Sequence, residues 1–412
     1  MRRMNQAAAI LAAALGAERA IAGPYGYDIH NTLMPASGAM AGTSLASPQD
    51  TPSAVFGNPA TLTQFPGTQF SFGATFYQPV VEITHDGSVT GAAFSARSGT
   101  KVFPVPNVAV TQDLKGLGLP ATLGLGLTVV SGIGAEFKDE PRSLGASAEL
   151  VVLGVNMGAG FRVAEGTSIG ATMTISYASL DAGLSSAAAL VHDIGVRGTI
   201  GASQNLGASS RLGMFYQTKL THRFDNLFQI AVDKSGLPVF TDQTVSQPAN
   251  LGIGLANTSL LDGRLLLSAD LLYKLWSDSA FWQDVYHDQL AFSLGAQLTR
   301  GHWRWRLGYG WAEDPNRNVP VKLGTLTSIR AGIPGITIPV TTPVIQYLQA
   351  TQTEVIYQHR LTGGLGYRDL LPGLDLDLHF GWQFQESRSF GGHTLAEVHS
   401  FHGGFALTWR FD

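Results

Sequence analysis

Basic residues that alternate with large apolar side chains are the positions of this sequence best suited to bind a ligand. Arg304 and Arg306 stand between Trp303, Trp305 and Leu307, and a β-strand sends successive side chains to opposite faces. Arginine can hold a carboxylate through two parallel hydrogen bonds, and lysine offers a point charge. Basic residues on inward faces or in a late loop are therefore our candidates for binding an acidic headgroup. They are Arg211, Lys274, Arg304, Arg306, Lys322 and Arg330.

The same cations also have a simpler interpretation. A buried charge needs a partner, so an inward arginine or lysine often does no more than pair with a nearby acid. Asp270, Asp375 and Asp377 lie in segments of the same alternating kind and are suitable partners, as are the carboxylates of residues 23–67, the segment before the first strand. Pairing and headgroup binding both stay open for each basic residue.

Catalytic and metal-binding chemistry have no comparable signal. The chain contains no cysteine, which excludes disulfides, thiol catalysis and cysteine-ligated metals. Its serines and its eleven histidines form no recognisable nucleophile motif. His399 and His402 are three residues apart, so in a strand they would face opposite sides and would not easily share a metal. We therefore expect no enzyme, no metal site and no cofactor.

The composition favours short turns and closely approaching strands. Charged residues make up 14% of the chain, well below the ~25% usual for soluble domains. Glycine occurs 49 times, although each glycine inside a helix costs about 1 kcal/mol relative to alanine. The net charge of −4 is spread along the chain, so nothing indicates a nucleic-acid partner.

Residues 1–22 are predicted to be a secretory signal peptide. Arg2 and Arg3 give a positive start, Ala7–Ala17 is apolar, and Ala20-Ile21-Ala22 fits a cleavage site. The alternative is a transmembrane anchor. The apolar run is shorter than the roughly 20 residues that a spanning helix needs, so we expect export.

Later segments alternate apolar and polar residues with the period of a β-strand. Trp303–Trp311, Leu374–Phe384 and Leu265–Leu275 each place large apolar side chains on one face. Faces this rich in aromatic residues fit lipid and its aromatic belts better than a soluble core. Fourteen such segments can be counted. They span residues 68–83, 102–113, 120–137, 146–163, 167–183, 191–205, 210–224, 246–257, 264–276, 289–299, 302–313, 353–367, 374–386 and 398–411.

The connections between these segments are of two kinds. Links after even-numbered strands are brief, such as Ala164–Gly166, whereas those after odd-numbered strands are longer, up to Asp314–Gln352. Short turns on one side, long loops on the other and an even strand count are typical of outer-membrane barrels. We predict an all-β fold, a fourteen-stranded antiparallel transmembrane β-barrel over residues 68–412 in the bacterial outer membrane. The alternating aromatics of Phe401–Phe411 resemble an assembly signal, so the barrel-assembly machinery is an expected partner.

Residues 23–67 lack strand alternation and are rich in glycine, alanine, serine and proline. They are either a flexible tail or a plug folded into the lumen. Met34–Leu62 reads MPASGAMAGTSLASPQDTPSAVFGNPATL and resembles the N-terminal hatch of the FadL family of long-chain fatty-acid transporters. The matching residues are Gly38, Gly42, Asp50, Ser53, Ala54, Asn58, Pro59 and Ala60.

The resemblance extends over the predicted barrel. Ala269–Ser277 looks like the family's D-x-x-Y-x-x-W-S strand, and Gly308–Pro315 and His359–Tyr367 look like its late strands. It implies a hatch inside the lumen, passive uptake of long hydrophobic molecules, and their exit sideways through the wall. It also implies a gating role for Asn58-Pro59-Ala60. The glycines of the third strand are candidates for a kink in the wall; they are Gly124, Gly126, Gly132 and Gly134.

Two longer loops are candidate capture surfaces for such a ligand. One contributes Leu227, Phe228, Ile230 and Phe240, and the other spans Val319–Leu348. The alternative is that these residues pack on one another as a lid. The expected partners are a fatty acid or an aromatic hydrocarbon and the outer-membrane lipid, with the protein acting as a monomer. A channel for monoaromatic hydrocarbons and a general diffusion porin are the competing functions.

Overall fold

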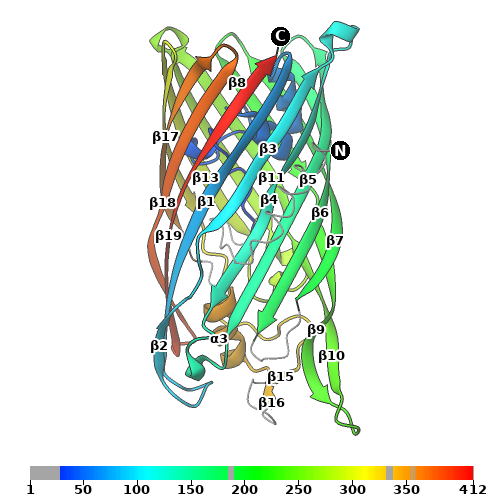
Figure 1. The fold of residues 1–412 in the computed structure, drawn as a ribbon, viewed down its shortest axis with the longest axis vertical. Helices are drawn as coiled ribbons and strands as arrows, with labels where there is room; N and C mark the ends of the chain where they lie inside the picture. The colour runs from blue at the N-terminus through cyan, green and yellow to red at the C-terminus, as the bar shows by residue number, and fades with distance from the viewer. Residues whose placement is uncertain (1–27, 184–189, 331–336, 354–355, 357, 412) are drawn as a thin grey trace.

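A computed structural model of the protein describes residues 28–183, 190–330, 337–353, 356 and 358–411. The predicted signal peptide, residues 1–22, lies outside the described residues. Within them, fourteen antiparallel strands form a closed barrel, and a short fifteenth strand, β2 (Phe94–Arg97), pairs only with β1 (Figure 1). The barrel strands are β1 (Thr68–His85), β3 (Phe103–Asp113), β4 (Ala121–Glu136), β5 (Ser147–Ala164), β6 (Thr167–Gly183), β7 (Val191–Leu206), β8 (Ser210–Gln217), β11 (Ala249–Leu260), β12 (Leu265–Leu275), β13 (Gln289–Arg300), β14 (Trp303–Ala312), β17 (His359–Leu371), β18 (Leu374–Phe390) and β19 (Thr394–Phe411).

The barrel closes because its first and last strands pair along their whole length. The register between β1 and β19 runs from Thr68↔Phe411 to His85↔Thr394 without a shift. Closure removes the sheet edges, whose unpaired backbone groups lipid cannot satisfy. The predicted fold class is confirmed.

The two faces of the wall differ as the alternation predicts. Trp305, Leu307 and Phe380 are 55%, 59% and 58% exposed on the outer face. Their neighbours Arg306 and His379 point inward and are buried. An apolar outer belt around polar inner positions is the pattern of a barrel that lies in lipid.

The two ends of the barrel also differ. One end carries β2, the hairpin of β9 (Leu220–Val232) and β10 (Pro238–Gln247), the short strands β15 (Ser328–Arg330) and β16 (Thr337–Pro339), and helix α3 (Thr342–Gln352), all at the bottom of Figure 1. The C-terminus lies at the opposite end, among the short turns. We call these the loop end and the turn end.

Two predicted strands have different bounds in the structure. The seventh was expected over 210–224, but β8 ends at Gln217, and Leu220–Phe224 belongs to β9, which pairs with β10. The same alternation, with buried Leu220, His222 and Phe224, fits a strand in the wall and a strand in a hairpin equally. The twelfth was expected over 353–367, but β17 runs from His359 to Leu371 because helix α3 extends to Gln352.

Residues 28–67 form the hatch, which occupies the lumen toward the turn end (Figure 1). It contains the single turn η1 (Gly38–Met40), helix α2 (Thr51–Phe56) and the 3₁₀ helix η2 (Pro59–Gln64). Asp50 organises it, because one carboxylate oxygen caps α2 at the Ser53 N–H (2.8 Å) and the other accepts from the Ala36 N–H (2.7 Å) and the Ser37 N–H (2.8 Å). The segment is thus a packed plug, as the resemblance implied, and not a tail.

Glycines in the wall let the hatch backbone approach closely. A Cβ added to Gly170 would lie 2.5 Å from the Pro59 carbonyl carbon, and one added to Gly160 would lie 2.7 Å from the Pro59 oxygen. Any larger residue at these positions would have to displace the hatch. Among the described residues, no helix is both long and apolar enough to cross a lipid bilayer.

Candidate functional site

The hydrogen-bonded wall is interrupted between β3 and β4. Their ladder runs from Asp113↔Thr122 to Asn107↔Thr128 and goes no further among the described residues. Beyond it, β3 contains Pro104 and Pro106, which have no N–H to donate. At the loop end the two sides meet again, where the Gly99 N–H donates to the Glu136 oxygen (2.8 Å). We call the stretch between these points, with residues 103–106 on one side and 129–135 on the other, the ladder gap.

A β-bulge in β4 accompanies the ladder gap. The register between β4 and β5 shifts between Val129 and Ser131, so Val130 is the extra residue. A bulge bends its strand and re-aims the neighbouring side chains. The irregularity lies in the third barrel strand, where the kink was expected, but at Val130 and not at a glycine. Gly124 and Gly126 instead let Leu62 and Phe56 of the hatch pack against the wall.

The first described residues of the hatch cover the ladder gap. The Ile29 N–H donates to the Val130 oxygen (3.2 Å), and Asp28 forms an antiparallel bridge with Ser131. The hatch therefore takes the place that a neighbouring strand would have beside β4. Such pairing satisfies backbone groups that the missing ladder leaves without β-strand partners.

Two side chains of the hatch fill the same place. Ile29 and Leu33, which we call the plug residues, are 1% and 2% exposed. They form one buried apolar cluster with Tyr77, Phe103, Val105 and Val129 of the wall. The Leu33 oxygen also accepts hydrogen bonds from Thr75 Oγ1 (2.7 Å) and Asn107 Nδ2 (3.1 Å). The ladder gap is thus closed by hatch side chains and not by strand pairing.

A buried ion pair anchors this end of the hatch. Lys274 Nζ lies 2.5 Å from Asp28 Oδ2, and both side chains are 1% exposed. Asn250 Nδ2 donates to the same oxygen (2.9 Å). Burial alone would raise the pKa of Asp28, but the charges of Lys274 and Arg197 outweigh it and lower the pKa to about 2. Asp28 is therefore ionised at neutral pH and is held by Lys274.

The middle of the hatch has its own attachments to the wall. Asp270 Oδ2 accepts from the Ser44 N–H (2.7 Å) and the Leu45 N–H (3.0 Å). Arg360 donates to the Ala41 oxygen (2.7 Å). These buried hydrogen bonds from wall side chains to the hatch backbone fix this part of the hatch on β12 and β17.

Asn58 links two parts of the hatch to the wall. Its Nδ2 donates to the Leu45 oxygen (2.7 Å) and to the Ala202 oxygen of β7 (2.9 Å), while its Oδ1 accepts from the Ala60 N–H (3.1 Å). Pro59 follows as the first residue of η2. Only an amide both donates and accepts in this way. The Asn58-Pro59-Ala60 motif lies against β5, β6 and β7, whereas the ladder gap lies between β3 and β4.

The other basic candidates have partners in the structure. Arg306 pairs with Asp377 and Arg304 with Asp375 (3.5 Å), and the partly exposed Arg211 donates to Asn205 (2.9 Å) and to Gln64 of the hatch. Lys322 is exposed and lies 3.2 Å from Asp284 at the loop end. Arg330 belongs to β15, and its side chain lies outside what the structure describes. Among the five candidates whose side chains the structure describes, Lys274 is the one that contacts the hatch segment over the ladder gap.

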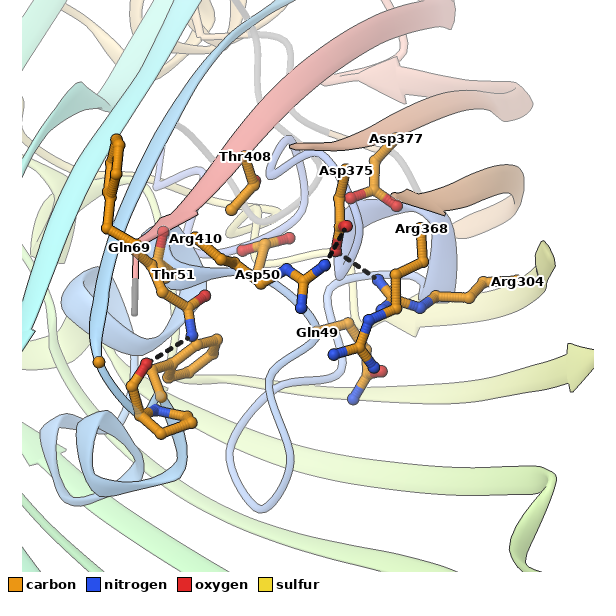
Figure 2. Close-up of a pocket in the computed structure, with 14 residues that line it drawn as sticks. Gln49, Asp50, Thr51, Gln69, Arg304, Arg368, Asp375, Asp377, Thr408 and Arg410 are labelled. Atoms are coloured by element: carbon orange, nitrogen blue, oxygen red, sulfur yellow. Dashed lines mark hydrogen bonds and ion pairs between the residues drawn. The ribbon is translucent and has the colours of Figure 1, made fainter. Parts of the chain in front are cut away.

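Arg304 opens into a polar cavity of about 420 Å³ at the turn end (Figure 2). Hatch residues Gln49–Thr51 form one side, and Arg368, Arg410 and Asp375 form the other. Arg410 donates to Asp375 (3.1 Å) and also pairs with Asp369. This network of arginines and aspartates joins the ends of β14, β17, β18 and β19 beside the hatch.

At the loop end an aromatic lid covers the lumen. Trp282 stacks on Tyr286 with ring centroids 5.1 Å apart, and Trp276 meets both rings edge-on. These rings belong to one buried apolar cluster that also holds residues of helix α3, of the hatch and, from β4, Val130 and Ile133. Apolar side chains therefore run without a break from the lid to the ladder gap.

The candidate capture residues are part of this lid. Leu227 is 1% exposed within the cluster, Phe228 packs partly buried against it, and Phe240 is half-buried in β10. The side chain of Ile230 lies outside the described part of the chain. The packing of Leu227 matches the alternative of a lid, and capture by these loops stays a proposal.

A family model described as "Outer membrane protein transport protein (OMPP1/FadL/TodX)" matches residues 13–200. Over these residues the chain is similar to the FadL family. The match covers the hatch, β1 and β3 to β6, and most of β7, which include both sides of the ladder gap. The family is one of transport proteins of the outer membrane, in agreement with the predicted location.

Solved structures share the fold of this chain. The toluene transporter TodX of Pseudomonas putida is 19% identical, with a TM-score of 0.65 over 95% of this chain and 99% of that one. A Pseudomonas aeruginosa FadL homologue is 16% identical, with a TM-score of 0.65 over 94% and 100%. The Ralstonia pickettii toluene transporter TbuX is 18% identical, with a TM-score of 0.62 over 92% and 98%. No curated protein matches the sequence.

Sequence reasoning missed the residues that close the ladder gap of this barrel. Asp28, Ile29 and Leu33 precede the Met34–Leu62 stretch on which the resemblance rested, and nothing local marks them. Pro104 and Pro106 were a usable signal, because prolines two apart within a strand remove consecutive donors on the same edge. Trp282 of the lid had no usable signal in the sequence, because a single tryptophan in a loop can have many roles.

Proposed function

We propose that this FadL-family channel takes up long hydrophobic acids, such as long-chain fatty acids, by passive transport. The cargo enters at the loop end and leaves sideways through the ladder gap into the membrane when the hatch moves. One observation carries the proposal: the ladder between β3 and β4 is interrupted, and hatch side chains close that place. If β3 and β4 paired along their whole length, there would be no gap for Ile29 and Leu33 to fill.

The lining of the route supports apolar cargo. The buried cluster below the lid is continuous with Val130 and Ile133 of β4, so a long acyl chain would meet apolar side chains from entry to exit. Binding sites for such ligands are apolar with a few placed polar groups. A general diffusion porin needs a hydrated lumen, whereas the hatch and the apolar cluster fill this one.

The charges of the lumen favour an acid over a hydrocarbon. Lys274 and Arg197 are buried at the loop side of the hatch, where a carboxylate headgroup would arrive below the lid. The second candidate is a monoaromatic hydrocarbon, because solved relatives are described as toluene transporters and as a monoaromatic hydrocarbon channel. A small neutral ring would use the same apolar route without needing Lys274.

The remaining roles follow from this proposal. Asn58-Pro59-Ala60 serves as the joint about which the hatch moves, and the loops around β9 and β10 gather cargo from the outside. The barrel is placed in the membrane by the barrel-assembly machinery. It works as a monomer, because one closed barrel contains the whole route.

Locking the hatch over the ladder gap tests the proposal. The chain has no native cysteine, so Asp28→Cys with Ser131→Cys would create the only disulfide. Bridged antiparallel residues have Cα atoms about 4.5–5.5 Å apart, within the roughly 4.4–6.8 Å that a disulfide needs. Ala159→Cys with Ala171→Cys, which are partners across β5 and β6, is the matched control away from the gap.

The assay is uptake of a labelled long-chain fatty acid by cells that lack their own transporter. We expect the wild type and the control to restore uptake, and the locked variant to do so only after reduction. Equal uptake by the oxidised locked variant would show that cargo does not use the ladder gap. Failure of the folded wild type to take up fatty acid, with uptake of labelled toluene, would favour the second candidate.

A further inference from the structure

The ion pair between Lys274 and Asp28 lies on the cargo path proposed above, between the aromatic lid and the ladder gap. Lys274 is two residues before Trp276 of the aromatic lid, on the inward face of β12. Asp28 belongs to the hatch, so this contact joins the wall below the lid to the segment that covers the ladder gap. A carboxylate that passed the lid would meet Lys274 before it reached the gap.

The same ion pair is directly coupled to the closure of the gap. Asp28 is followed at once by the plug residue Ile29, whose N–H bonds to Val130 of β4. Asp28 itself bridges to Ser131, the next residue of the bulge. Asp28 therefore cannot leave Lys274 by any large distance while Ile29 stays on Val130. The contact of Asp28 with Lys274 and the contact of Ile29 with Val130 are therefore made and lost together.

We propose that the carboxylate of the cargo opens the gate by replacing Asp28 at Lys274. This inference rests on the proposed function and adds to it the trigger and the class of cargo that can operate it. Two carboxylates compete for one ammonium group, so the site binds either the hatch or the cargo. The channel is thereby closed in the absence of an acid and opens when one arrives.

The exchange is physically balanced at Lys274. The lysine keeps a carboxylate partner throughout, so the exchange never leaves its buried positive charge without one. Asp28, once displaced, would be a buried carboxylate without its ammonium partner, and that is unfavourable. It therefore moves away and takes Ile29 off Val130. A ligand shifts such an equilibrium only through different affinities for the two states, and the cargo binds only where Asp28 has left.

Neutral molecules lack the group that this exchange requires. A hydrocarbon or an alcohol of the same chain length would fill the apolar cluster but would leave Asp28 on Lys274. The exchange at Lys274 thus selects for an acid. The apolar lining separately selects for chain length and hydrophobicity. Removing the charge of Asp28 should abolish this selection.

A cysteine behind the plug reports the opening directly. Val105 is 1% exposed beneath Ile29 and Leu33, and Val105→Cys would be the only thiol of the chain. Its rate of reaction with a water-soluble maleimide measures exposure of the gap in the purified full-length protein in micelles. The probes are palmitate, hexadecanol as its neutral counterpart, and buffer alone.

We expect palmitate to accelerate labelling at least tenfold and hexadecanol to leave it unchanged. With Asp28→Asn, labelling should be fast in all three solutions, and Lys274→Gln should behave alike. Lys219→Gln is the matched control, since this exposed lysine pairs with Asp278 at the loop end, away from the hatch (2.8 Å), and it should keep the palmitate response. Gel migration with and without heating shows that each barrel is folded.

The outcomes separate this inference from the proposed function. Equal acceleration by palmitate and hexadecanol, or a slow and palmitate-responsive Asp28→Asn protein, would overturn the exchange even if cells still took up fatty acid. Slow labelling of the wild type in every solution, together with absent uptake, would overturn both. Acceleration by palmitate alone, lost with either charge, would establish the exchange.

Discussion

Replacing Asn58 by alanine should loosen the hatch while the barrel stays folded. The side chain is fully buried, and its amide makes three hydrogen bonds, to the Leu45 oxygen, the Ala202 oxygen and the Ala60 N–H. Two of them join the hatch to itself and one joins it to β7. Alanine would remove all three and leave the partner groups in a place that water does not reach.

The size of the effect follows from these contacts. A typical hydrogen bond contributes about 1 kcal/mol to stability, and a buried group that loses its partner costs about 1–3 kcal/mol. Three contacts therefore correspond to about 3 kcal/mol for local opening of the hatch. Because about 1.4 kcal/mol is a factor of ten, the open population should rise on the order of 100-fold.

Hydrogen exchange of the purified protein measures this population by region. We expect the amides around Leu45 and Ala60 to exchange on the order of 100-fold faster in Asn58→Ala, while the β18 and β19 amides keep their rates. Asn58→Asp should be at least as disruptive, because a carboxylate keeps the acceptor for Ala60 but places negative charge against two carbonyl oxygens. Asn257→Ala, whose side chain bonds only at the turn end to Ser210 and Ser259, is the control.

A hatch that exchanges within threefold of the wild type in Asn58→Ala would refute this reasoning. Its stability would then come from close packing against the wall glycines alone. Faster exchange throughout the barrel would be equally contrary, since it would make the hatch part of the global fold and not a separately moving unit.

Three further predictions concern the hatch and the lid. The pKa of Asp28 is lowered to about 2 from an ordinary value of 3.8. Its ionised form therefore stabilises the closed hatch above pH 3.8, and this contribution is lost as the pH falls through about 2. Pepsin should cut the hatch of the wild type faster as the pH is lowered through this range, and Asp28→Asn should show no such step. Gly170→Val should expel the hatch from the lumen, because even a Cβ would lie 2.5 Å from the Pro59 carbonyl carbon. Limited digestion with trypsin should then cut the hatch and leave the barrel intact, and an uncut hatch would contradict this prediction. Trp282→Ala removes a ring stacked on Tyr286 and should destabilise the lid by about 3–5 kcal/mol, so that uptake saturates at a higher fatty-acid concentration; an unchanged half-saturation point would show that the lid takes no part in capture.

The barrel was predictable because its signal is local and repeated. Each wall strand alternates lipid-facing and lumen-facing residues, as Trp305, Arg306 and Leu307 do, and the alternation needs no knowledge of the partner strand. The length of these segments also supports the prediction, because a strand that crosses the bilayer must be this long. The same reasoning failed at Leu220–Phe224, because a hairpin outside the wall has the same period.

The site was only partly predictable because its contacts join distant parts of the chain. The ladder gap is a place where two strands do not pair, and pairing cannot be predicted from the sequence of either strand alone. Asp28 meets Lys274 and Ile29 meets Val130 across more than a hundred positions of sequence. Lys274 could be named as an inward cation from its place in the alternation, but its partner could not be chosen among several acids.

The seamless closure of the barrel has a consequence for how the protein is made. Eighteen residue pairs join β1 to β19, the first wall strand to the last, so the cylinder can be sealed only after the whole chain has been synthesised. The hatch is made before any of these strands, yet it ends up enclosed by all of them. The hatch must therefore reach the lumen either before β1 pairs with β19 or through an open end of the closed barrel, so placing the hatch is a separate step of assembly from synthesising it.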